Sequence, residues 1–236
     1  MGRLGVAVVL AWLVFDRVAA VTGSVRGEAG GLVALVVLAV VLVLDRALLG
    51  RGWRESLLSL GVGRPSARGV LTAAVVAGAL LAFFPLYARA TGARLVVAPG
   101  ALTLLPGLFA QGGFAEELLF RGFLFGRLRE GRSFWRAAAL ALVPFAAAHL
   151  FLFATLPPAI AAAATLLAAV MSFPLARLYE LGGRTIWPPA LVHFVAQGAI
   201  KLIAAEPPPA LPMGLPWMAA CMVVPWLAFA VRPARS

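Results

Sequence analysis

The sequence predicts an all-α membrane protein, a polytopic transmembrane helical bundle of about eight spans with both termini in the cytoplasm. Three observations support this fold class. Of the 236 residues, 63% are hydrophobic and only 12% are charged. The mean hydropathy of +0.99 lies far above the usual range of soluble domains. Apolar runs of about 20 residues, the length a helix needs to cross a hydrocarbon core, recur along the chain between Gly, Pro and Arg.

The apolar runs follow one another with short connections, so residues 1–236 are predicted to form a single integral membrane domain. A polar stretch after the second run contains Trp53, Leu57, Leu58 and Leu60. These residues predict either an amphipathic helix along the membrane surface or an ordinary basic loop. The predicted spans are 4–22, 31–49, 70–88, 101–126, 134–153, 159–178, 186–204 and 211–231.

The net charge of +11 would suggest a nucleic-acid partner in a soluble protein. Here the arginines lie mostly between apolar runs and do not alternate with aromatic residues, so we expect no nucleic-acid partner and instead a lipid bilayer. With eight spans, most arginines fall on the side that also holds both termini. Because cytoplasmic loops carry the Lys and Arg excess, that side is predicted to be cytoplasmic.

Four ionisable side chains stand out inside the predicted spans: Glu116, Glu117, His149 and His193, the last two being the only histidines of the protein. Ionisable groups in lipid-embedded helices are costly and usually face the bundle interior for a functional reason. At about 1.5 Å of rise per residue, Glu116, His149 and His193 lie about 14 to 20 Å from the arginines at the cytoplasmic end of their helices. Three helices therefore bring Glu, His and His to a similar depth, which predicts one shared site.

Residues four apart share a helix face, and the spacing yields two such pairs. Glu117 and Arg121 are predicted to form a buried ion pair, which leaves Glu116, rotated by about 100°, to act on a water as general base. His149 is predicted to share that water. His193 and Gln197 form the second pair, whose donors suit the oxyanion of a tetrahedral intermediate.

A metal-dependent alternative stays open at this point, with no cofactor certain. Glu116, His149 and His193 also match the three protein ligands of a catalytic Zn²⁺ or another divalent metal, with water in the fourth position. The HExxH motif of common zinc proteases and the GxSxG motif of serine hydrolases are both absent from the sequence.

The remaining in-span charges are predicted to be structural. Asp16 with Arg17 and Asp45 with Arg46 are expected to pair at helix ends near the membrane interface. Lys201 is expected to extend toward the outer surface.

The residues singled out above resemble the motifs of the CPBP family of membrane-embedded proteases, which includes CAAX-processing endopeptidases and bacteriocin-immunity relatives. An EExxxR motif, an FxxxH motif and a motif of His followed four residues later by Asn or Asp characterise that family. The chain matches them, in the same order, with Glu116, Glu117 and Arg121, with Phe145 and His149, and with His193 and Gln197. Gln197 departs from the pattern, since it keeps the amide but adds a methylene.

The resemblance implies an intramembrane endopeptidase, or metalloendopeptidase, whose motif-bearing core is 101–204 and whose site opens to the cytoplasmic side of a bacterial plasma membrane. Its partner would be a peptide or membrane-protein substrate; the sequence leaves the oligomeric state open. By similarity, Glu116 and His149 activate water, and His193 and the residue at 197 hold the oxyanion. Two alternatives remain: a catalytically weak or inactive member that binds peptides as an immunity or scaffold protein, and a proton-coupled transporter.

Overall fold

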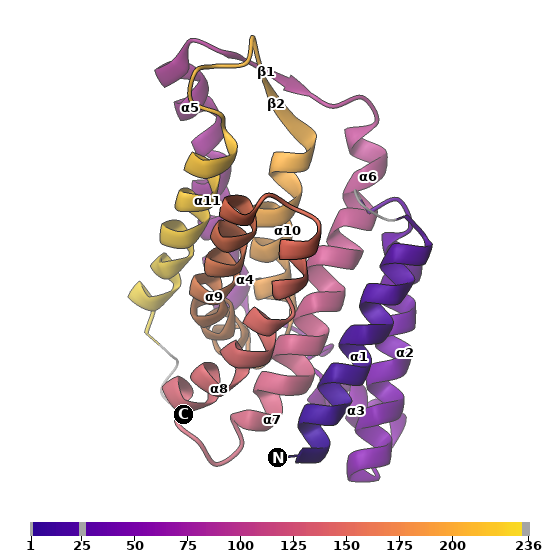
Figure 1. Cartoon of the computed structure of the whole chain (residues 1–236). Coiled ribbons are helices and arrows are strands. Elements are labelled where there is room, and N and C mark those ends of the chain that lie inside the picture. The colour runs from indigo at the N-terminus through magenta and orange to yellow at the C-terminus, as the bar shows by residue number, and fades with distance from the viewer. Residues whose placement is uncertain (1, 24–26, 233–236) are drawn as a thin grey trace.

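The structure, a computed structural model that describes residues 2–23 and 27–232, is a bundle of long helices (Figure 1). Within these residues, five helical segments are long and apolar enough to cross a membrane, which confirms the all-α membrane bundle. They are α1 (Gly2–Val21), α2 (Gly30–Leu49), α4 with α5 (Ala67–Leu81 and Phe83–Thr91), α8 with η3 (Phe134–Ala147 and Leu150–Ala154) and α9 (Pro158–Leu181).

The other three predicted spans are also helical. Residues 101–128 form one continuous helix, whose successive parts are α6 (Ala101–Leu108), η1 (Phe109–Ala115), η2 (Leu118–Phe125) and α7 (Gly126–Leu128). The last two are α10 (Trp187–Leu202) and a shorter apolar pair, α11 (Gly214–Val223) with η4 (Val224–Ala230). The helix positions therefore agree with the sequence, and the count of eight spans stays a prediction.

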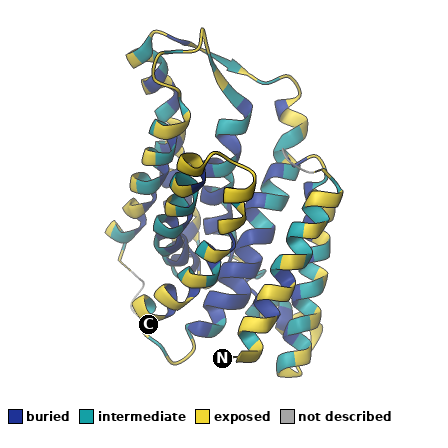
Figure 2. Cartoon of the chain, viewed as in Figure 1, coloured by how far each residue is buried: buried dark blue, intermediate teal, exposed yellow. Residues whose placement is uncertain are grey.

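The helix of residues 101–128 lies at the centre of the bundle. All residues from 115 to 126 are buried, as the dark blue ribbon in Figure 2 shows. Because this part carries Glu116, Glu117 and Arg121, exposing it to lipid would be costly, and neighbouring helices enclose it. Glycines let the neighbours approach: a Cβ on Gly122 would lie 2.2 Å from the carbonyl oxygen of Leu60, and one on Gly113 would lie 2.8 Å from that of Ala190.

Two apolar clusters pack on this central helix. One joins its lower part to α1, α2 and α8 and includes Val37, Phe123 and Phe145. The other joins α4, α9, α10 and α11 and includes Leu80, Leu175 and Trp217. The central helix thus belongs to the first cluster and contacts α10, which belongs to the second.

The two ends of the bundle differ in character. At one end α1 begins, and the connections 50–52, 60–66, 129–133 and 182–186 carry arginines; we refer to these connections as the arginine-rich end (Figure 1). The stretch expected to form either a surface helix or a loop is helical there as α3 (Trp53–Ser59), with Trp53 and Leu58 exposed and Leu60 buried. The opposite end carries an unpredicted antiparallel ribbon of β1 (Arg94–Val97) and β2 (Ile203–Glu206), in which Arg94 faces Glu206.

Candidate active site

The two adjacent glutamates lie halfway along the central helix and are the two residues between its π-helical stretches η1 and η2. A π-helical turn is wider than an α-helical one and is often found at functional sites. Glu117 is fully buried and Glu116 is 9% exposed, so both carboxylates are withdrawn from the outer surface of the bundle. Carboxylates at this depth require partners.

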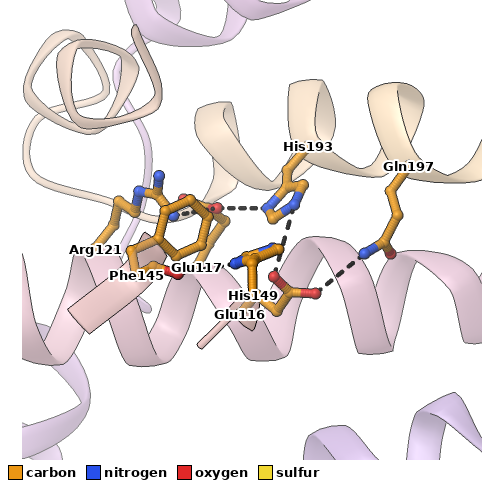
Figure 3. Close-up of polar contacts among 7 residues, drawn as sticks. All are labelled: Glu116, Glu117, Arg121, Phe145, His149, His193 and Gln197. Atoms are coloured by element: carbon orange, nitrogen blue, oxygen red, sulfur yellow. Dashed lines mark hydrogen bonds and ion pairs between the residues drawn. The ribbon is translucent and has the colours of Figure 1, made fainter. Parts of the chain in front are cut away.

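Glu117 is held by two cationic or donor groups at once. Its Oε1 accepts a hydrogen bond from Arg121 Nη1 at 3.0 Å and another from His193 Nδ1 at 2.7 Å (Figure 3). The Arg121 guanidinium in turn lies 4.2 Å from the centre of the Phe145 ring. The ion pair expected from the spacing of Glu117 and Arg121 is therefore present, and it also orients a histidine.

His193 lies between the two glutamates (Figure 3). Because a carboxylate accepts hydrogen bonds, the 2.7 Å contact with Glu117 places a proton on Nδ1. The other ring nitrogen, Nε2, then faces Glu116, with 3.7 Å to its Oε2. A carboxylate behind a histidine fixes its tautomer and ring orientation in many active sites.

Gln197 reaches Glu116 from the next turn of α10. Its Nε2 donates to Glu116 Oε1 at 3.2 Å. The longer side chain fits because residue 112 is glycine: a Cβ there would lie 1.8 Å from Gln197 Oε1. The missing side chain at Gly112 thus leaves room on the central helix for the extra methylene of Gln197.

His149 lies just beyond the end of α8. Its Nδ1 donates to the carbonyl oxygen of Phe145 at 2.8 Å, which leaves Nε2 as the nitrogen able to accept a proton. The Phe145 ring meets the His149 ring edge to face, with 5.0 Å between ring centres. Phe145, the first residue of the FxxxH motif, therefore supports both His149 and Arg121.

A cavity of about 340 Å³ joins these groups. Glu116, His149, His193 and Gln197 all line it, and its remaining wall is largely apolar, with side chains from α1, η3 and α9. Trp12 of α1 lies across it from Phe151, with 6.2 Å between ring centres. The structure thus gathers the six predicted site residues in one cluster, four of them at the cavity surface.

Lys201 was not among the predicted site residues, yet it lines the same cavity. It lies in the last turn of α10, and its place in the cavity wall was not expected. A signal was available in the sequence, because His193, Gln197 and Lys201 are spaced four apart and so share one face of α10.

The fit of a metal ion can be tested on the donor set. Among residues 2–23 and 27–232, no three His, Cys, Asp or Glu side chains form a group that could hold a metal ion. Nδ1 of each histidine is already hydrogen-bonded, to Glu117 and to the Phe145 carbonyl. These bonds leave Nε2 of each histidine as the ligand atom, which is the usual arrangement at metal-binding histidines, so they are compatible with a metal ion although the three side chains do not form a ready ligand group.

Comparison with known proteins agrees with the motifs. Residues 98–199 match the family model described as "Type II CAAX prenyl endopeptidase Rce1-like". This stretch, less than half of the chain, is similar to the Rce1-like family, and we refer to it as the Rce1-like segment. The Rce1-like segment contains all six predicted site residues and ends two residues before Lys201. No curated protein and no solved structure matches the chain.

The family is one of endopeptidases, as its description states. The Rce1-like segment covers the central helix, α8, α9 and most of α10, whereas α1, which supplies Trp12 and Phe15 to the cavity wall, lies outside it. The polar groups of the cavity other than Lys201 thus lie within the segment that carries the family likeness, whereas Lys201 and part of the apolar wall lie outside it.

Proposed function

We propose that the chain is an intramembrane endopeptidase that hydrolyses a peptide bond with a water activated by Glu116. The observation that carries this proposal is the convergence of Glu116, His149, His193 and Gln197 from three helical segments on one apolar-walled cavity. A carboxylate that is buried, adjacent to imidazoles and open to a cavity suits general-base catalysis. The Rce1-like match supports the same class of reaction.

In the first step, Glu116 removes a proton from a water in the cavity while the water oxygen bonds to the carbonyl carbon of the substrate. His149 directs its Nε2 toward the same space, because its Nδ1 is bound to the Phe145 carbonyl. It accepts a hydrogen bond from the water and so orients the attacking lone pair. The C=O double bond opens, and its oxygen becomes an oxyanion.

In the second step, donors on α10 stabilise the oxyanion until it collapses. The Gln197 amide has two N–H groups, of which one is bonded to Glu116; the other is assigned to the oxyanion. His193 contributes through Nε2, and the negative charge of Glu117 stabilises its imidazolium form. When the C–O bond regains double-bond character, the C–N bond breaks and Glu116 returns the proton to the leaving nitrogen.

Glu117 and Arg121 are positioning residues in this scheme. Glu117 holds His193 by Nδ1, and Arg121 compensates the charge of Glu117 at 3.0 Å. Neither of them lines the cavity. Their role is to keep the imidazole of His193 in one tautomer and one orientation.

The cavity wall supports a hydrophobic substrate. Its lining is mostly Phe, Leu and Ala side chains, with few polar groups beyond the four assigned above and Lys201. The name of the matched family points to a prenylated peptide that ends in a Cys-aliphatic-aliphatic-X sequence. We therefore propose an apolar or lipid-modified peptide segment, free or part of a membrane protein, as the substrate class.

The test is cleavage of a fluorogenic prenylated CAAX peptide by the purified chain in proteoliposomes. Glu116→Gln keeps the size of the side chain and removes the base, so we expect kcat to fall by about 10² to 10⁴ fold. Glu55→Gln, at an exposed carboxylate on α3, is the matched control and should leave kcat unchanged. A Glu116→Gln protein with more than half of the wild-type kcat would rule out the proposed chemistry.

Zinc dependence, the alternative stated for the same residues, is tested in the same assay. The steps above use no metal, so we expect the rate to survive dialysis against 1,10-phenanthroline. Loss of activity that added Zn²⁺ restores would instead assign Glu116, His149 and His193 as metal ligands.

We also propose that the chain crosses the membrane eight times with the arginine-rich end and both termini in the cytoplasm, as the positive-inside rule predicts. The α8–α9 connection, which contributes Leu156 to the cavity wall, lies at the far end of α9 from the arginine-rich end. An impermeant maleimide that labels Leu156→Cys from the outer side agrees with this orientation. Labelling from the inner side would overturn this orientation and would place the α8–α9 connection on the cytoplasmic side.

A further inference from the structure

A second pocket lies at the arginine-rich end, away from the candidate active site. Its volume is about 560 Å³, and it lies between the start of α4, the α7–α8 connection and the last turn of α9. Four arginines and two glutamates line it: Arg68, Arg129, Arg177, Arg184, Glu130 and Glu180. Counted as formal charges, four positive and two negative groups leave a net charge of +2.

Three of these arginines donate hydrogen bonds to neutral main-chain carbonyl groups, which do not compensate their positive charge. Arg68 donates to the carbonyl oxygen of residue 232 at 3.0 Å, Arg177 to that of residue 231 at 2.5 Å, and Arg184 to that of residue 126 at 3.4 Å. A main-chain carbonyl carries no net charge. By contrast, Arg129 forms an ion pair with Glu180 at 2.5 Å. The pocket is therefore both polar and electropositive.

The start of α4 adds to this positive potential. Ser66 lines the pocket and caps α4, accepting a hydrogen bond from the main-chain nitrogen of Gly69 at 3.2 Å. The helix of 15 residues begins at this point. The N-terminus of a helix carries a partial positive charge and favours anions, and here it acts together with guanidinium groups.

Aromatic side chains place the pocket at the level of lipid headgroups. The Arg177 guanidinium lies 5.7 Å from the ring centre of Phe229. The Phe229 ring stacks on Trp135 at 5.4 Å and on Trp226 at 5.1 Å, and both tryptophans are exposed. Tryptophan gathers at the membrane–water interface. The pocket thus lies where α9, a membrane-length helix, reaches the interface.

We propose that this pocket binds a phosphate group, supplied by the headgroup of an anionic phospholipid or by free phosphate. Guanidinium groups form bidentate, charge-assisted hydrogen bonds to phosphate oxygens. Basic pockets between transmembrane helices recognise anionic lipid headgroups by the same chemistry. The net charge of +2 complements one phosphate, and the aromatic rings beside Arg177 suit the region just below a headgroup.

The experiment measures binding of phosphatidylglycerol to the full chain by native mass spectrometry, with phosphatidylcholine as the neutral lipid. Arg68→Gln with Arg184→Gln removes two exposed pocket charges. Each arginine near an anionic lipid contributes roughly fivefold, so we expect binding about 30-fold weaker. The control, Arg3→Gln with Arg54→Gln, removes the same charge from exposed sites outside the pocket and should change binding by less than about threefold.

The outcomes separate the possibilities. Equal weakening by both double variants would mean that the surface charge as a whole, and not this pocket, attracts the lipid, and would overturn the proposal. Binding of phosphatidylcholine as tight as that of phosphatidylglycerol would do the same. A further outcome is that inorganic phosphate at millimolar concentration displaces phosphatidylglycerol from the wild-type chain but not from Arg68→Gln with Arg184→Gln. That result would support the phosphate site and assign free phosphate as its source. If phosphatidylglycerol stays bound in millimolar inorganic phosphate, the lipid headgroup is assigned as the source of the phosphate group. If the double variant unfolds, each single substitution should weaken binding about fivefold.

Discussion

Two of the glutamate–arginine ion pairs lie in different environments, one buried and one partly exposed, and the contrast shows what burial does to a charge. Glu117 and Arg121, in the central helix, are joined at 3.0 Å with side chains 0% and 2% exposed. Arg129 and Glu180, at the arginine-rich end, are joined at 2.5 Å with side chains 32% and 20% exposed. Contact distance therefore does not distinguish the pairs, whereas access to water does.

The interior pair belongs to a chain of groups that depend on one another. Arg121 compensates Glu117, Glu117 orients His193, and His193 faces Glu116. A charge removed at one position leaves the next without compensation, because the side chains of Glu117 and Arg121 are shielded from solvent. At the arginine-rich end, solvent and headgroups can take the place of a lost partner.

The largest effect is expected from Arg121→Met, which leaves Glu117 buried without its arginine. We expect the free energy of unfolding in mixed micelles to fall by about 3 to 5 kcal/mol, the usual cost of leaving a buried charge uncompensated. Peptide cleavage should be lost as well, because Glu117 and His193 move when the arginine is absent. An unchanged free energy of unfolding would show that His193 alone compensates Glu117.

The double variant Glu117→Leu with Arg121→Met is the matched control for that result. It replaces both charges by apolar groups, and such replacements are often neutral or stabilising. The free energy of unfolding should therefore return close to the wild-type value. Cleavage should stay low, because His193 Nδ1 has no acceptor. Recovery of both stability and activity would show that Glu117 has no part in positioning His193.

A smaller effect is expected from Gly112→Ala. The new methyl group would lie 1.8 Å from Gln197 Oε1, so the Gln197 side chain must leave Glu116. Loss of a hydrogen bond to a charged group should lower kcat/KM by roughly tenfold to a hundredfold. Gly78→Ala is the control, because a Cβ on Gly78 of α4 meets no atom within 4 Å.

The coupling of Gly112 and Gln197 sharpens this prediction. Once Gln197→Ala has removed the amide, Gly112→Ala has nothing further to displace. The double variant should therefore be no slower than Gln197→Ala alone. If the two losses simply add, the glycine acts through something other than Gln197.

The candidate site was largely predictable from the sequence because its signals are local. Residues four apart on one helix gave the pair of Glu117 and Arg121 and the shared face of His193 and Gln197. Helical rise gave the common depth of the three motif-bearing segments. The shared use of Glu117 by Arg121 and His193 was not predictable, since it depends on how α10 packs on the central helix.

Contacts between distant parts of the chain were missed for the same reason. Asp45 was expected to pair with its neighbour Arg46, but it forms its ion pair with Arg127 on the central helix, and its side chain is fully buried. The ribbon of β1 and β2 joins residues 94–97 to residues 203–206. The sequence of either short segment gives no indication that it pairs with the other. Such pairings follow from the bundle's packing and not from a local pattern.

The smallest effect is expected from Glu180→Gln in the pair at the arginine-rich end. Because Arg129 keeps access to water and also donates to the carbonyl oxygen of Arg132, loss of the charge on Glu180 should lower the free energy of unfolding by less than about 1 kcal/mol. The same substitution raises the net charge of the pocket from +2 to +3, so phosphatidylglycerol should bind more tightly. A loss of several kcal/mol would show that this pair resembles the buried one despite its exposure. Weaker lipid binding would show that Glu180 holds Arg129 in the orientation that phosphate requires.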